Sequence, residues 1–221
     1  MTYVTSRRAM LIALAALAPV FRAQAQAPQT FTPTPPGPET PRPLPGERRI
    51  GRPEAPVTVI EYHSLTCGNC ARFHTEIFPR IKAAFIDPGL VNFLLRDFPL
   101  DRVALDAAAM VHCGGPERHE ALISTLYSNK ENWAHSSDPR GWLRRVSTLA
   151  GIPAARLEVC WSDRGFVDPI LVMRAEATRD FQVDATPSFV IGGQTYSGVL
   201  SFERFSQIVR PLLPAGSAPR G

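Results

Sequence analysis

The chain has 221 residues, of which 44% are hydrophobic and 20% are charged. This length suffices for one well-packed core, with or without a large insertion, and the composition is that of a globular protein. The formal net charge falls from +4 to +1 when residues 1–25 are set aside, because these residues include three arginines and no acidic residue. Since the sequence also lacks a glycine-rich phosphate loop and a basic and aromatic stripe, we expect no nucleic acid partner.

Residues 1–27 have the pattern of an export signal peptide. A basic start precedes an apolar stretch over 9–20, and small residues around Ala25 offer cleavage sites. The apolar stretch is too short for a membrane span, which needs about 20 residues. The basic start also resembles a twin-arginine signal, so both this route and the general export route stay open. The expected location is the periplasm.

Residues 28–46 form a proline-rich linker. Its first 18 residues, "PQTFTPTPPGPETPRPLP", contain eight prolines, which predicts a stiff, extended and solvated spacer. The alternative is an arm docked on the domain, with Phe31 or Leu44 as its anchor. We expect the folded part over 47–213 and a flexible tail over 214–221.

The folded part is expected to begin with a strand, a helix and a second strand. The β-branched and aromatic run over 57–63 predicts the first strand, and residues 89–98 predict the second. Between them, apolar residues recur every four positions over 67–85, as on one face of a helix. Pro79 should kink this helix, because proline lacks the amide hydrogen and crowds the preceding turn.

Strand signals are absent from residues 101–183, where helix-like segments follow one another. These segments are 101–113, 116–130, 139–150, 154–161 and 166–182. Two short strands around Gly192-Gly193 and a final helix capped by Ser201 complete the order. The sequence therefore predicts an α/β fold with helices inserted in the middle of the sheet.

Cys67 and Cys70 lie two residues apart where the first strand gives way to the helix. The unpaired amides and the dipole of a helix N-terminus stabilise a thiolate, which makes Cys67 the expected nucleophile and Cys70 the resolving thiol. A zinc site would lack a second C-x-x-C, although His74 offers one more ligand, and a structural disulfide across so short a loop would stabilise little. We predict no metal and no cofactor besides a redox-active Cys67–Cys70 disulfide.

Three motifs occur in the order "EYHSLTCGNCARFHTEIFP", "FLLRDFPLD" and "VDATPSFVIGG". They resemble those of the DsbA-like thiol:disulfide oxidoreductases of the thioredoxin superfamily. The resemblance implies a thioredoxin fold over 47–100 and 184–213, with a helical domain over 101–183 inserted in the middle of the sheet.

The same resemblance implies further site residues. Pro187 would be a cis proline after Thr186, packed against the disulfide, and the backbone beside it would pair with an extended substrate segment. Glu61 would be a buried acid beneath the active site, able to relay a proton to or from Cys70. An alternative for Glu61 is a surface charge on an edge strand.

The dipeptide between the cysteines departs from the family pattern. The best-known oxidases of the family have Pro-His, whereas this chain has Gly68 and Asn69. Asn69 brings no positive charge, so Cys67 is expected to be less acidic, and its disulfide less oxidising, than in those proteins. His63 is either a substitute source of charge or a packed side chain. The direction of catalysis stays open.

Cys113 and Cys160 both fall in the helical block. An even number of cysteines in an oxidising compartment favours pairing, so we predict a Cys113–Cys160 disulfide that staples the insertion. Two buried free thiols are the alternative.

The sequence thus predicts an exported thiol:disulfide oxidoreductase that forms disulfides in secreted proteins. Its partners would be unfolded or newly exported cysteine-containing proteins, and the resemblance implies a DsbB-like membrane reoxidant; we expect a monomer. A disulfide reductase or isomerase is the enzymatic alternative. From other classes, a copper or zinc carrier using the C-x-x-C and a catalytically silent peptide-binding module remain open.

Overall fold

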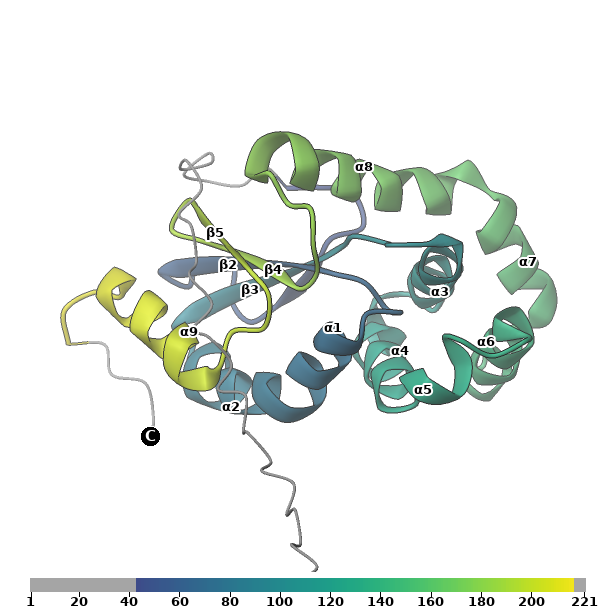
Figure 1. The fold of residues 1–221 in the computed structure, drawn as a ribbon, viewed down its shortest axis with the longest axis horizontal. Coiled ribbons are helices and arrows are strands. Elements are labelled where there is room, and N and C mark those ends of the chain that lie inside the picture. The colour runs from purple at the N-terminus through teal and green to yellow at the C-terminus, as the bar shows by residue number, and fades with distance from the viewer. Residues whose placement is uncertain (1–42, 217–221) are drawn as a thin grey trace, which may run out of the picture. The chain divides into compact units, whose positions relative to one another are not determined.

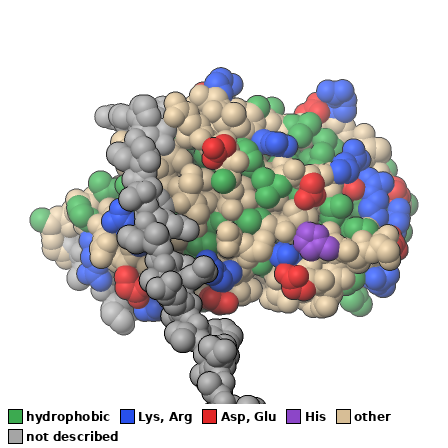
Figure 2. All heavy atoms as spheres, in the orientation of Figure 1, with side chains coloured by type: hydrophobic (Ala, Val, Ile, Leu, Met, Phe, Trp, Pro, Cys, Tyr) green, Lys and Arg blue, Asp and Glu red, His purple; other side chains and the backbone are tan. Residues whose placement is uncertain are grey.

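The computed structural model describes residues 43–216. The expected signal peptide over 1–27, most of the linker and the end of the tail lie outside these described residues, as does Phe31. Within the described part of the chain, no helix is long and apolar enough to cross a membrane. On the face shown in Figure 2, basic and acidic side chains are interspersed among apolar ones.

A five-stranded sheet forms the centre of the described chain (Figure 1). Its spatial order is β1-β3-β2-β4-β5, and β2 pairs parallel with β3 and antiparallel with β4. The strands are β1 (Arg48–Ile50), β2 (Val57–His63), β3 (Val91–Asp97), β4 (Ser188–Ile191) and β5 (Gln194–Ser197). Because β2 has a partner on both sides and is almost wholly buried, it is a central strand, and the residues that follow it start from a rigid base.

The two faces of β2 belong to different clusters of buried side chains. Val59 packs in the larger cluster with Phe73 and Phe189, whereas Ile60 and Tyr62 pack in the smaller cluster against the other face of the sheet. Side chains alternate along a strand, so Glu61 points to the same face as Val59. Glu61 therefore faces the helix that follows β2.

The predicted helix over 67–85 is observed as four consecutive helical segments. These are α1 (Gly68–Arg72), the π-helical η1 (Phe73–Ile77), α2 (Phe78–Ile81) and the π-helical η2 (Lys82–Ile86). Pro79 is the second residue of α2, which directly follows the first π turn. Since proline offers no amide to the carbonyl one turn earlier, a widened turn before it accommodates the mismatch. The expected disturbance at Pro79 thus takes the form of a π turn.

Six helices lie between β3 and β4, where helix-like segments are predicted. They are α3 (Arg102–Cys113), α4 (Pro116–Ser128), α5 (Lys130–Trp133), α6 (Pro139–Leu149), α7 (Ala154–Ser162) and α8 (Arg164–Phe181). The segment predicted as one helix over 116–130 ends at Ser128, and a separate short helix starts at Lys130. The α/β class with helices inserted in the sheet is confirmed.

The chain after the insertion forms a hairpin and a terminal helix. The turn between β4 and β5 contains Gly192 and Gly193, both with positive φ, as a tight hairpin turn requires. Helix α9 (Phe202–Val209) starts after Ser201, whose side chain accepts a hydrogen bond from the amide of Arg204 at 3.1 Å. A 3₁₀ turn, η3 (Arg210–Leu212), ends the helical part.

The edge strand β1 is not predicted from the sequence, because three residues with two arginines carry no strand pattern. Its pairing with β3 is a long-range contact that places Arg49 opposite Leu94. Just before it, Leu44 is 6% exposed and belongs to the larger core cluster, so the end of the expected solvated linker is in fact packed on the domain. Glu47 then accepts a hydrogen bond from the fully buried Arg96 at 2.6 Å.

Candidate active site

Cys67 lies at the N-terminus of α1, at the end of a short loop that follows β2. Cys67 is the N-cap residue, with φ −77° and ψ 122°, and its backbone amide donates to the carbonyl of Ser64 at 3.1 Å. Cys70, one turn later, is completely buried, and both residues are free thiols. Gly68 and Asn69 between them are exposed. The pair thus has one accessible and one buried sulfur.

The Thr186-Pro187 segment, which precedes β4, lies against Cys67. The Thr186-Pro187 peptide bond is cis, and the Sγ of Cys67 donates to the carbonyl oxygen of Thr186 at 3.3 Å. The carbonyl of Pro187 accepts from the amide of Gly198 at 2.8 Å, which ties the segment to the end of β5. The hydroxyl of Thr186 is buried and has no other hydrogen-bond partner among the described residues, so it is free to donate to a thiolate at Cys67.

The two thiols have pKa values shifted in opposite directions. The pKa of Cys67 is lowered to about 5, chiefly by a hydrogen bond from Cys70, with further bonds from Thr186 and the amides of Asn69 and Cys70; partial burial opposes this shift. The pKa of Cys70 is raised well above its ordinary value by burial first, and then by its bond to Cys67 and the charge of Glu61. At neutral pH, Cys67 is therefore a thiolate and Cys70 a thiol.

Glu61 lies beneath the cysteines on β2 and is completely buried. Its carboxylate oxygens are 3.0 and 3.1 Å from Nε2 of His74, a residue of the π-helical turn η1. A buried carboxylate is stable only with such a partner. Because the charge of Glu61 acts on Cys70, the Glu61–His74 pair belongs to the same site as the cysteines.

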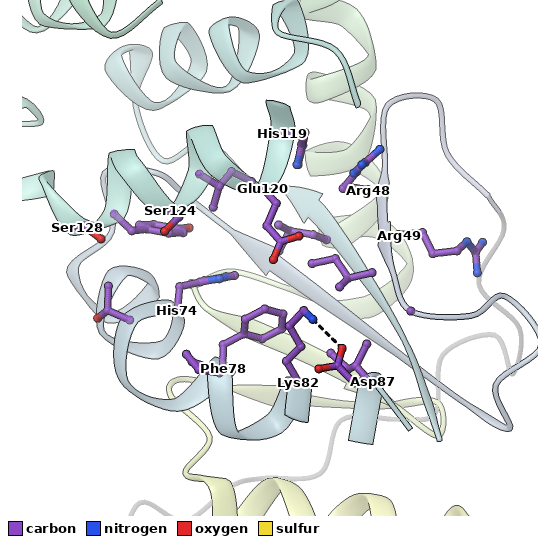
Figure 3. Close-up of a pocket in the computed structure, with 18 residues that line it drawn as sticks. Arg48, Arg49, His74, Phe78, Lys82, Asp87, His119, Glu120, Ser124 and Ser128 are labelled. Carbon is purple, nitrogen blue, oxygen red and sulfur yellow. Dashed lines mark hydrogen bonds and ion pairs between the residues drawn. The ribbon is translucent and has the colours of Figure 1, made fainter. Parts of the chain in front are cut away.

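His74 also borders a side cavity of about 610 Å³ (Figure 3). The cavity lies beside α2 and α4, and His74, Phe78 and Ser124 are among the side chains around it. At its edge, Lys82 donates to Asp87 at 2.6 Å. The ring of His74 stacks on Tyr127, with 4.8 Å between ring centroids. Through His74, the buried Glu61 therefore has a link to a cavity that none of the cysteines line.

His63, the last residue of β2, is packed and neutral. Burial lowers its pKa to about 4, and its Nδ1 is 2.6 Å from the hydroxyl of Tyr127. The nearby carboxylate of Asp97 is engaged by His112, whose Nε2 lies 2.6 Å away. His63 therefore brings no positive charge to Cys67 at neutral pH. Of the two interpretations of His63, the packed side chain is the one that the geometry supports.

The remaining cysteines are placed away from this site. Cys113, at the end of α3, and Cys160, in α7, are joined by a disulfide with 5.9 Å between their Cα atoms. Their bond links two helices of the insertion. Among the described residues, no group of three or more His, Cys, Asp or Glu side chains is arranged to hold a metal ion.

The sequence alone does not predict the parts that two residues, His74 and Thr66, play in this site. His74 stands out there only as a metal ligand, although its position one helical turn after Cys70 places it on the same helix face. Thr66 also joins the site, because its hydroxyl donates to Asp101 at 2.8 Å and so ties the active-site loop to the start of α3. No local pattern predicts that second contact.

Comparison with known proteins agrees with this geometry. A family model described as "Thioredoxin" matches residues 44–210, and the chain therefore belongs to the thioredoxin family. Within that family its fold is that of the DsbA-like proteins. It is similar to the crystal structure of Wolbachia pipientis alpha-DsbA1, with a TM-score of 0.71 and 28% identity over 77% of this chain and 92% of the other. It also shares its fold with oxidised BdbD of Bacillus subtilis, with a TM-score of 0.68, 19% identity, and coverage of 76% and 92% of the two chains.

Proteins that are similar in sequence have names that refer to disulfide chemistry. A Rickettsia bellii protein named "Putative protein-disulfide oxidoreductase" is 27% identical over 65% of this chain and 56% of its own length. The "Disulfide bond formation protein D" of Bacillus subtilis is 42% identical over 40% of this chain and 43% of its own length. The chain thus spans little more than half the length of the first of these relatives.

Proposed function

We propose that the protein is a thiol:disulfide oxidoreductase that forms disulfides in other proteins through Cys67 and Cys70. The observation that carries the proposal is the opposite shift of the two thiol pKa values at a helix N-terminus facing the Thr186-Pro187 segment. A low pKa at Cys67 stabilises the reduced pair and so makes its disulfide a stronger oxidant. Oxidation is therefore favoured over reduction, even though Asn69 carries no charge.

The reaction proceeds by two exchanges. A substrate thiolate attacks Sγ of Cys67 in the Cys67–Cys70 disulfide, and the S–S bond breaks with Cys70 as the leaving thiolate. Cys70 takes up a proton, because its buried thiolate is unfavourable. A second substrate thiolate then attacks the substrate sulfur of the mixed disulfide, and Cys67 leaves as a stable thiolate. The substrate gains a disulfide, and the pair has taken up its two electrons.

We assign the proton of Cys70 to Glu61. The carboxylate lies beneath Cys70 and away from bulk solvent, so it can relay a proton that arrives by way of His74 to Cys70 when Cys70 leaves, and return one when the pair is reoxidised. His74 holds Glu61 in place and connects it to the side cavity.

The substrate is a protein segment that contains cysteine. The backbone around Thr186 and Pro187 precedes β4 and adjoins Cys67, so an extended segment placed there lies beside the reactive sulfur. Strand addition of this kind binds through the main chain and accepts many sequences. Such tolerance suits an enzyme that acts on unfolded or newly exported proteins.

The cellular setting is part of the proposal. The basic and apolar residues at the start of the chain favour export, and the periplasm is a compartment in which disulfides persist. A monomer that is reoxidised by a DsbB-like membrane partner would complete the cycle.

The test is disulfide transfer to a reduced peptide with two cysteines. The oxidised protein should convert the peptide to its disulfide with stoichiometric reduction of Cys67–Cys70, and Cys67→Ser should abolish transfer. Failure to oxidise the peptide, together with rapid reduction of insulin by the reduced protein, would reassign the protein as a reductase. Stoichiometric copper or zinc that is lost in Cys67→Ser would point to a metal carrier instead.

A further inference from the structure

Lys130 is a buried lysine beside Gly68, the residue that follows Cys67. It is the first residue of α5, and its side chain is only 7% exposed. A buried ammonium group costs free energy unless anions surround it. The only other lysine of the chain, Lys82, lies by the side cavity and is 34% exposed. The burial of Lys130 therefore calls for a compensating interaction with an anion.

The ammonium group of Lys130 lies against the residue that follows Cys67. A methyl group placed on Gly68 would be 3.6 Å from Cε and 3.9 Å from Nζ of Lys130. Gly68 is exposed, so the buried ammonium group of Lys130 lies just beneath the surface of the site. The absence of a side chain at Gly68 makes room for this approach.

The rest of the insertion holds Lys130 in place. Trp133, in the same short helix, is fully buried, and its indole N–H donates to the carbonyl of Leu126 at 2.9 Å. The ring of Trp133 also stacks on Trp142, with 5.9 Å between centroids. Because α4 contacts α1, this anchoring fixes the start of α5 against the active-site helix.

The charge of Lys130 is only partly balanced by its neighbours. Glu131 lies 2.8 Å from Nζ, but it is 82% exposed, and a solvated carboxylate offsets little of the cost of burial. His135, at the end of the same turn, is exposed and acts on Glu131. On the facing helix, the exposed Arg72 is a further cation. An anion at Cys67 would complete the charge balance on the side of Gly68.

We propose that Lys130 is a further functional residue of the redox site. Its ammonium group supplies the positive charge beside Cys67 that the Gly68-Asn69 dipeptide lacks, and it stabilises the thiolate of Cys67. Lys130 is a positioning residue for charge and takes no part in bond exchange. The inference rests on the proposed function, because the thiolate it stabilises is the leaving group of the second exchange.

The test compares Lys130→Met with wild type. Methionine keeps the apolar stem and removes the charge, so it separates charge from packing. Thiolate absorbance near 240 nm gives the pKa of Cys67, and equilibration with reduced and oxidised glutathione gives the redox balance. Because hydrogen bonds are the larger causes of the low pKa of Cys67, we expect about threefold less thiolate at a pH below the midpoint. The glutathione equilibrium should shift about threefold toward the protein disulfide, which corresponds to about 14 mV.

Two variants make the result specific. Lys130→Arg keeps the charge and should restore most of both values, whereas Lys82→Met, the same change at the other lysine, should leave them unaltered. If Lys130→Met does not fold, Lys130→Gln provides the same comparison. A wild-type pKa and a wild-type glutathione balance in folded Lys130→Met or Lys130→Gln would overturn the inference.

The experiment also separates this inference from the proposed function. If the wild-type protein failed to exchange with glutathione at all, the proposed function would fail, while the thiolate titration would still report on Lys130. If the wild-type protein exchanges and the lysine variants match it, only the role of Lys130 fails.

Discussion

Glu61 and His74 approach to 3.0 Å between a central strand and the active-site helix. The pair is buried below Cys70 and reaches the side cavity through the imidazole ring. Cys67, in contrast, lies against Thr186, 119 positions along the chain, whose side chain is one of the groups that lower the pKa of Cys67. The accessible thiolate and the buried thiol of the redox pair thus have separate supporting contacts, and each can be tested separately.

The acidity of Cys67 predicts the pH dependence of its alkylation. With a pKa of about 5, the rate of reaction of the reduced protein with iodoacetamide should rise through a midpoint near pH 5 and then level off. Cys70 should stay unreactive because it is buried and protonated. Mass spectrometry of the alkylated site at a series of pH values measures this. A midpoint near that of an ordinary thiol, about 8.5, would contradict the assignment.

The same pKa predicts how redox state alters stability. The folded-state pKa of Cys67 lies well below its ordinary value, so its contribution to stability grows as pH rises from 5 toward that ordinary value and is lost as pH falls through 5. Urea unfolding of the reduced and oxidised proteins at pH 7 and pH 4 measures the effect. The free energy of unfolding of the reduced protein, relative to that of the oxidised protein, should be larger at pH 7 than at pH 4. A stability difference between the two forms that does not change with pH would show that Cys67 is not a thiolate in the folded protein.

We expect proton transfer to Cys70 to slow when the Glu61–His74 pair is broken. Glu61→Gln keeps the shape but cannot carry the proton of Cys70, so single-turnover exchange with a reduced peptide should slow by on the order of 10²-fold. His74→Gln should slow the reaction less and change its pH profile. Stopped-flow measurements across pH test both variants. Glu203→Gln, at an exposed acid on α9, is the matched control. Equal rates in Glu61→Gln and this control would remove Glu61 from the mechanism.

The Cys113–Cys160 disulfide is expected to stabilise the fold without taking part in exchange. It closes a loop of 47 residues, and the loss of chain entropy on closure gives an upper estimate of about 4 kcal/mol. The double variant Cys113→Ser/Cys160→Ser should therefore unfold at a lower urea concentration. Its rate of peptide oxidation at a temperature where it is folded should match that of wild type. A large loss of exchange in the folded variant would show that the second disulfide supports the active site.

The sequence predicts much of the fold because its signals are local. The β-branched run of β2 and the helix-like segments of the insertion have the right type and order, since these patterns depend on neighbours within a few residues. The π turn before Pro79 and the break at Asn129 are finer features that the same patterns describe only roughly. The edge strand β1 has no local signal, because its existence depends on pairing with β3.

The cysteine spacing and the change from strand to helix determine, by themselves, that this chain carries a C-x-x-C pair at a helix N-terminus. Only the tertiary structure decides the environment of each sulfur. The contacts of Cys67 with Thr186, of Glu61 with His74 and of Gly68 with Lys130 join separate elements, and the last two are not evident in the sequence. Charge and hydrogen bonding act through space, so the acidity of Cys67, and with it the direction of exchange, depends on packing.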